Sequence, residues 1–169
     1  MQAFGTSLFP RLAAYLARVQ VELESIPADR RVELERLAAF IREQGRKGET
    51  ARLTFICTHN SRRSLLAQVW AQTAAHACRV HTVECFSGGA SAAAFDPRAV
   101  AALTRAGFLV EARTTGENPV IAVRCGAELA PAECFSKRYD EPPHPPGKQG
   151  PINNIIESQG LQPFSPRSG

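Results

Sequence analysis

The chain of 169 residues is 44% hydrophobic and 21% charged, which suits one globular domain with a core and excludes a disordered polyelectrolyte. Its net charge is +4 and the basic residues are spread along the chain, which favours anionic ligands but gives no case for a nucleic-acid partner. Five cysteines without a CxxC pair indicate reduced thiols in the cytoplasm, and no apolar stretch is long enough to span a membrane.

The first part of the chain, residues 1–50, is predicted to be an N-terminal helical extension. In its first half Leu12, Leu16, Val19 and Leu23 repeat at helical spacing, and in its second half Leu34, Leu37, Ala38 and Ile41 do the same. Pro27 separates the two stretches. The pattern predicts a helical hairpin that packs on the domain behind it.

The next part, residues 51–146, has the pattern of a parallel α/β domain. The apolar run 53–56 predicts a buried strand, a polar loop and an amphipathic helix follow, and residues 80–87 predict a second strand. Asp96 and Pro97 then form a helix start, and Gly107 is a natural helix end. Strand, helix, strand and helix in this order predict an α/β fold, a parallel sheet with flanking helices.

The pattern weakens after Phe108. Residues 119–123 and 134–136 are predicted to form short strands. From Pro142 prolines and glycines accumulate, so residues 147–169 are predicted to be an irregular or disordered tail.

One segment carries chemistry, the loop between the first predicted strand and the helix after it. It reads Cys57-Thr58-His59-Asn60-Ser61-Arg62-Arg63-Ser64. A Cys and an Arg with five residues between them, such as Cys57 and Arg63, are weak evidence alone. However, a strand–loop–helix setting aims backbone N–H groups and a helix N-terminus at an anion, and it favours the thiolate of a cysteine placed there.

In this arrangement each polar residue of the loop has an expected role. The Arg63 fork can hold two oxygens of a phosphoryl group, and Ser64 can donate a hydrogen bond to the sulfur. Asn60 tolerates positive φ and can hydrogen-bond the loop backbone. The loop therefore predicts nucleophilic catalysis by Cys57 on a phosphoryl group.

With these residues the chain resembles the low-molecular-weight protein tyrosine phosphatase and arsenate reductase family. Residues 53–67, Phe86-Ser87-Gly88-Gly89 and residues 95–108 carry the resemblance, and the helical pair resembles an extension of bacterial members. The resemblance implies a low-molecular-weight phosphatase-like fold, with Cys57, Arg63 and Ser64 as catalytic residues. It implies phosphate binding by the loop residues Thr58, His59, Asn60, Ser61, Arg62 and Arg63, without a metal or another cofactor.

The chain also departs from the family pattern. His59 stands where the family usually has glycine, and Arg62 stands where many members have a second cysteine. The family's general acid lies in an Asp-Pro loop near its C-terminus. Here Asp96 is explained by helix capping, and Asp140 is only a weak candidate for the acid. From Gly147 the resemblance ends, so the domain is expected to be partial and incomplete at its C-terminus.

Three functions follow as hypotheses. The first is a phosphatase that acts on a phosphorylated protein or a small aryl phosphate through a cysteinyl-phosphate intermediate. The second is an arsenate reductase that uses the same loop; Cys125 and Cys134 do not match the family's redox segment, so a relay is not expected. The third is a truncated, catalytically impaired remnant that binds oxyanions.

Overall fold

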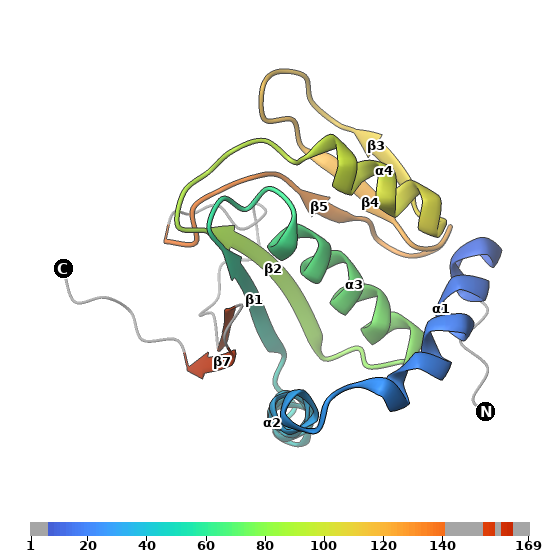
Figure 1. Cartoon of the computed structure of the whole chain (residues 1–169), viewed down its shortest axis with the longest axis vertical. Coiled ribbons are helices and arrows are strands. Elements are labelled where there is room, and N and C mark those ends of the chain that lie inside the picture. Colours follow the sequence, from blue (N-terminus) through green and yellow to red (C-terminus); the bar gives the residue numbers. More distant parts are fainter. Residues whose placement is uncertain (1–6, 141–153, 158–159, 164–169) are drawn as a thin grey trace.

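The computed structural model describes residues 7–140 and two short segments, 154–157 and 160–163. This part of the chain is an α/β protein with a larger, mainly parallel sheet, flanking helices and a small antiparallel sheet (Figure 1). The elements are α1 (Pro10–Glu22), a 3₁₀ turn (Leu23–Ser25), α2 (Ala28–Arg46), β1 (Ala51–Cys57), α3 (Arg63–Ala77), β2 (Val83–Gly89), α4 (Pro97–Ala106), β3 (Leu109–Ala112), β4 (Ile121–Arg124), β5 (Ala132–Cys134), β6 (Asn154–Glu157) and β7 (Gly160–Pro163).

The larger sheet is built around β1 and has the strand order β2-β1-β6-β7. β1 and β2 are parallel, with Ala51 opposite Val83 at one end and Cys57 opposite Gly89 at the other. The predicted parallel pair of strands is therefore confirmed. Because both strands end at the same edge, the segments that follow Cys57 and Gly89 are neighbours.

The tail is partly ordered, contrary to the prediction for residues 147–169. β6 pairs in parallel with β1, and β7 pairs antiparallel with β6. The sequence 154–157 contains two isoleucines, whose branched side chains favour strands, and pairing satisfies backbone groups along an edge of β1. The remaining tail residues, 147–153, 158–159 and 164–169, and the predicted domain end at 141–146 lie outside the described residues.

The small sheet corrects a second expectation. The short strands predicted at 119–123 and 134–136 form as β4 and β5, but with β3 they make an antiparallel sheet in the order β3-β4-β5, whereas the predicted fold class named only a parallel sheet. The connections 113–120 and 125–131 are shorter than the dozen or so residues that a parallel crossover requires, so the chain turns back on itself. The strand β3 was not predicted.

Helix α3 lies between the two sheets and contributes to both cores (Figure 1). Ala75 belongs to a cluster with Leu53 of β1 and Val83 of β2. Leu65 and Val69 belong to the larger cluster, which also contains residues of α1, α4, β4 and β5. The helix that follows the loop is thus held firmly on both sides, which fixes the position of its N-terminus.

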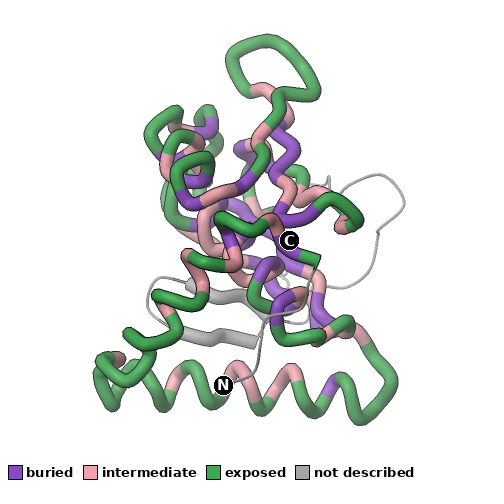
Figure 2. Tube along the Cα trace, turned by 90° about the vertical axis from the view of Figure 1, so that its right-hand side faces the viewer, coloured by how far each residue is buried: buried purple, intermediate pink, exposed green. Residues whose placement is uncertain are grey.

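The two predicted N-terminal helices form, but they are not a paired hairpin. Leu12 of α1 is fully buried in the larger cluster, whereas Leu37 and Ile41 of α2 pack against the cluster of β1 and β2. The two helices therefore pack against different parts of the domain. Figure 2 shows that both helices are mainly exposed, and Leu23 and Leu34 of the predicted apolar stripes are 52% and 38% exposed.

Within the described part of the chain, no helix has both the length and the apolar character needed to cross a lipid bilayer.

Candidate active site

The predicted loop joins the end of β1 to the start of α3 and lies beside the end of β2. Ala90 N–H donates to the Cys57 carbonyl at 3.1 Å, and Ser91 N–H donates to the Thr58 carbonyl at 2.8 Å. A Cβ atom on Gly89 would lie 2.6 Å from the Asn60 nitrogen, so only glycine fits at this position. The segment after β2 thus supports the first half of the loop.

The sulfur of Cys57 is surrounded by hydrogen-bond donors of its own loop. Its Sγ lies 3.0 Å from Ser64 Oγ. Burial opposes ionisation, but hydrogen bonds from the Ser64 hydroxyl and from the backbone N–H groups of Ser64, Asn60 and His59 outweigh it, so the pKa of the thiol lies below its usual value. The thiolate is therefore favoured, which is the state a nucleophile requires.

Asn60 fixes the shape of the loop from behind. The residue is fully buried and has φ of 45°, a left-handed conformation that asparagine tolerates better than most residues. Its Nδ2 donates to Ser64 Oγ at 2.8 Å, and its Oδ1 accepts from the Lys137 N–H at 2.9 Å. With its lone pair occupied by the Asn60 amide, the Ser64 hydroxyl is oriented to donate its proton to the sulfur of Cys57.

A pocket of about 170 Å³ opens in front of the sulfur. It accommodates a few water molecules, at roughly 30 Å³ each, and is therefore of the size of a small tetrahedral anion. It is lined by the loop and the segment after β2, namely by Cys57, His59, Ser61, Arg62, Arg63, Ala93 and Asp96. Two arginines, one aspartate and a cysteine with a lowered pKa therefore share one small pocket.

The predicted site residues thus fall into two groups. Cys57, His59, Ser61, Arg62 and Arg63 line the pocket directly.

Thr58, Asn60 and Ser64 do not line the pocket. Thr58 Oγ1 accepts a hydrogen bond from Arg63 Nη2 at 3.3 Å, while Asn60 and Ser64 lie buried behind the sulfur. These three residues orient the residues that do line the pocket.

Asp96 is the pocket residue that sequence reasoning missed, because its role as a helix cap explained it fully. Its carboxylate does accept from the Arg98 N–H at 2.8 Å, but it also lies 3.5 Å from Arg62 Nε. Hydrogen bonds from the Arg98 side chain and backbone, with the charges of Arg98 and Arg62, hold the pKa of this carboxyl below its usual value. The Asp96 carboxyl group is thus held in its ionised form at the side of the pocket, where it is a poor proton donor.

Asp140, the weak candidate for a general acid, is not among the residues that line the pocket. Its two carboxylate oxygens accept from the guanidinium of Arg138 at 3.0 and 2.7 Å.

A second set of supporting residues comes from far along the chain and was also missed. Ser136 Oγ donates to the His59 carbonyl at 3.0 Å and accepts from the Ala93 N–H at 2.7 Å. Asn118 holds Ser136 by two hydrogen bonds to its backbone, of 2.8 and 3.0 Å. The segment after β5 therefore joins the loop to the segment after β2. In the sequence, the only indication of this contact was that polar residues, Ser136 among them, follow the predicted short strand.

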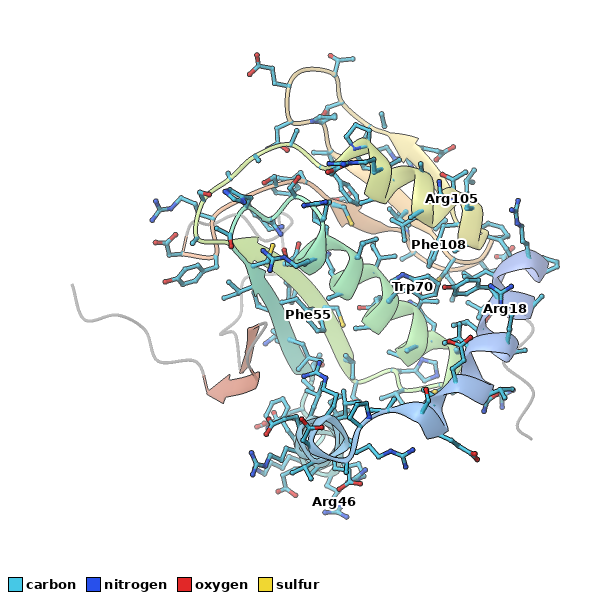
Figure 3. The ribbon with its side chains drawn as sticks, viewed as in Figure 1. Arg18, Arg46, Phe55, Trp70, Arg105 and Phe108 are labelled. Carbon is cyan, nitrogen blue, oxygen red and sulfur yellow. The ribbon has the colours of Figure 1, made fainter. Side chains whose placement is uncertain are left out.

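The remaining candidates contribute no chemistry to the pocket. Cys125 and Cys134 are free, buried thiols, and burial raises their pKa values, that of Cys134 to about 12. Trp70 lies beside Phe108 (Figure 3) and packs between Tyr15 and Phe108, at ring-centre distances of 5.3 and 5.0 Å, so it packs against the larger core cluster and not in the pocket. In the part of the chain that the structure describes, no three His, Cys, Asp or Glu side chains gather to hold a metal ion.

Comparisons with protein-family models, with curated proteins and with solved structures found no match to the chain. The functional assignment therefore depends on the geometry of the loop and its pocket.

Proposed function

We propose that the chain is a cysteine-dependent phosphatase of the low-molecular-weight protein tyrosine phosphatase type. The observation that carries the proposal is the 3.0 Å contact between Cys57 Sγ and Ser64 Oγ in a loop whose amides also face the sulfur. Parallel strands that hold this loop between β1 and α3 are consistent with the phosphatase-like fold. The proposed substrates are phosphorylated proteins or small aryl phosphates, in the reducing cytoplasm where the thiol stays free.

In the proposed reaction the Cys57 thiolate attacks phosphorus while the bond from phosphorus to the leaving oxygen breaks. Arg63 and the loop amides stabilise the charge on the three equatorial oxygens. The products are a cysteinyl phosphate and an alkoxide or phenolate, which takes up a proton from solvent to give the alcohol or phenol. Water then attacks the cysteinyl phosphate and releases inorganic phosphate, and the sulfur departs as a thiolate stabilised by Ser64.

The leaving oxygen needs a proton unless it departs as a stable anion. The carboxylate in the pocket, Asp96, is held ionised by Arg98 and Arg62 and is a poor proton donor. We therefore expect phenolate leaving groups of low pKa to be preferred strongly. Asp96→Asn, which keeps the helix cap, is expected to leave that preference unchanged; a selective loss of turnover of phenols with high pKa would instead assign the acid to Asp96.

Turnover of p-nitrophenyl phosphate tests the proposal. Activity should be present in the wild type, absent in Cys57→Ser and retained in Cys78→Ser, a matched control because Cys78 is an exposed free thiol outside the pocket. Equal turnover by wild type and Cys57→Ser would refute it.

The same preparation tests the two alternatives. Thiol-dependent reduction of arsenate would favour an arsenate reductase. Binding of phosphate without either activity would favour an oxyanion-binding remnant.

A further inference from the structure

A second cleft lies between α3, the edge strand β2 and the segment around β5. It has a volume of about 430 Å³ and shares no lining residue with the pocket of Cys57. This size falls in the range of cavities that hold small organic ligands. The exposed part of its wall is mostly apolar, with Phe86 and Phe135 among the lining residues.

One residue that lines the cleft, Lys137, carries an ammonium group without an ion-pair partner among the described residues. Lys137 lines the cleft and is only 8% exposed. Its Nζ lies 4.4 Å from the centre of the Phe135 ring, and no carboxylate lies within 4.0 Å of it among the described residues. Because a buried charge is normally paired, this ammonium indicates a place for an anion.

The two glutamines that line the cleft already have partners. Gln72 accepts from the Cys85 N–H at 3.1 Å and donates to the Val83 carbonyl, so that it covers the edge of β2. Gln68 accepts from Ser87 Oγ at 2.6 Å and donates to the Glu133 carbonyl. These two amides are occupied by hydrogen bonds of the fold, whereas Lys137 is a buried cation among the residues that line the cleft.

Titratable groups near Lys137 include Cys134, Glu84, Glu133, His76 and His81, and among the described residues none of them forms an ion pair with it. Burial raises the pKa of the Cys134 thiol to about 12, so this thiol is neutral near pH 7. Glu84 on β2 is paired with Arg52 at 3.2 Å, and Glu133 on β5 is exposed. His76 on α3 and His81 after it also line the cleft; burial and then the neighbouring His81 lower the pKa of His76, so His76 is neutral near pH 7.

We propose that this cleft is a second ligand site, for a small aromatic carboxylate whose anion binds Lys137 and whose ring packs against Phe86 and Phe135. A single ammonium matches a singly charged carboxylate, whereas a phosphate dianion is better matched by the arginines and amides of the other pocket. The aromatic walls match a flat apolar body. The proposal is independent of the phosphatase function, because it uses none of the residues that line the first pocket.

Binding of benzoate to the full chain tests the proposal, measured by calorimetry and by ligand-observed NMR. Benzamide, which has the same shape without the charge, is expected to bind at least tenfold more weakly. Lys137→Met, which keeps the length of the side chain and removes its charge, is expected to weaken benzoate binding at least tenfold. Arg63→Ala and saturating inorganic phosphate are expected to leave benzoate binding unchanged, since both act on the first pocket.

Two measurements on the wild type keep the test valid if Lys137→Met does not fold. Nuclear Overhauser contacts should join benzoate to the Phe135 ring, and benzoate binding should weaken above about pH 8 as the ammonium loses its proton. The absence of benzoate binding at millimolar concentration would overturn the proposal. Equal affinity for benzamide, or displacement by phosphate, would overturn it as well.

Discussion

Replacement of Asn60 by alanine is expected to damage both the loop and the stability of the fold. The change removes two buried hydrogen bonds, to Ser64 Oγ and from the Lys137 N–H, each worth about 1 kcal/mol. It also places alanine at φ of 45°, which costs about 1 kcal/mol more. A loss of about 3 kcal/mol lowers the melting temperature of a chain of this size by about 6–12 °C, which thermal denaturation followed by circular dichroism measures.

Asn60→Gly separates the two causes. Glycine adopts the left-handed conformation without strain but makes neither side-chain hydrogen bond, so its loss should be smaller by about 1 kcal/mol. Both variants should also slow alkylation of Cys57, because the Ser64 hydroxyl is no longer oriented toward the sulfur. The reasoning is refuted if Asn60→Ala melts within about 2 °C of the wild type, or if glycine destabilises more than alanine.

Three further predictions concern the thiol, the N-terminal helix and the buried lysine. Ser64→Ala is expected to slow alkylation of Cys57 by iodoacetamide about tenfold near pH 6, because the thiolate loses a charge-assisted hydrogen bond; an unchanged pH profile would contradict this. Leu12→Ala should lower the free energy of unfolding by about 2–5 kcal/mol, since Leu12 is fully buried, whereas the half-exposed Leu23→Ala should change it by less than about 0.5 kcal/mol in the same urea titration. Burial lowers the pKa of Lys137 to about 8. Between that pH and the ordinary pKa of lysine, Lys137 is protonated in the unfolded chain but not in the folded one, so the stability of the wild type rises with pH. The wild type should therefore gain about 2 kcal/mol relative to Lys137→Met between about pH 7 and about pH 9.5 in urea unfolding, and a constant difference would count against the buried charge.

Local patterns predicted the elements around the loop well. The strand before Cys57, the helix that starts at Arg63 and the capped helix from Pro97 to Ala106 all form, because each combines an apolar period with a suitable end. Asp96 does accept the Arg98 N–H, as a cap should. Such signals lie within a few residues of one another and are therefore visible in one sequence.

Contacts between distant segments could not be predicted in the same way. Nothing local to Ser136 shows that its hydroxyl reaches the loop, 77 residues earlier, and nothing local to Asn118 shows that it holds Ser136. The direction of β3, β4 and β5 depends on the length of the turns between them, and the strand 154–157 depends on an edge of β1 that the sequence does not show. Likewise, helical periodicity predicted the apolar side of α2 but not the partner it packs against.

The hydrogen bonds of Ser136 and Lys137 mean that the octapeptide is not an autonomous module. The hydrogen bonds of its His59 carbonyl and its Asn60 side-chain amide are completed by the segment after β5, which the ribosome makes 77 residues later. During synthesis, the loop therefore cannot be completed before residues 136 and 137 have been added to the chain. If these eight residues were transferred to another strand and helix, they would keep the sequence of the motif but lose the hydrogen bonds from Ser136 and Lys137 that hold the loop in shape.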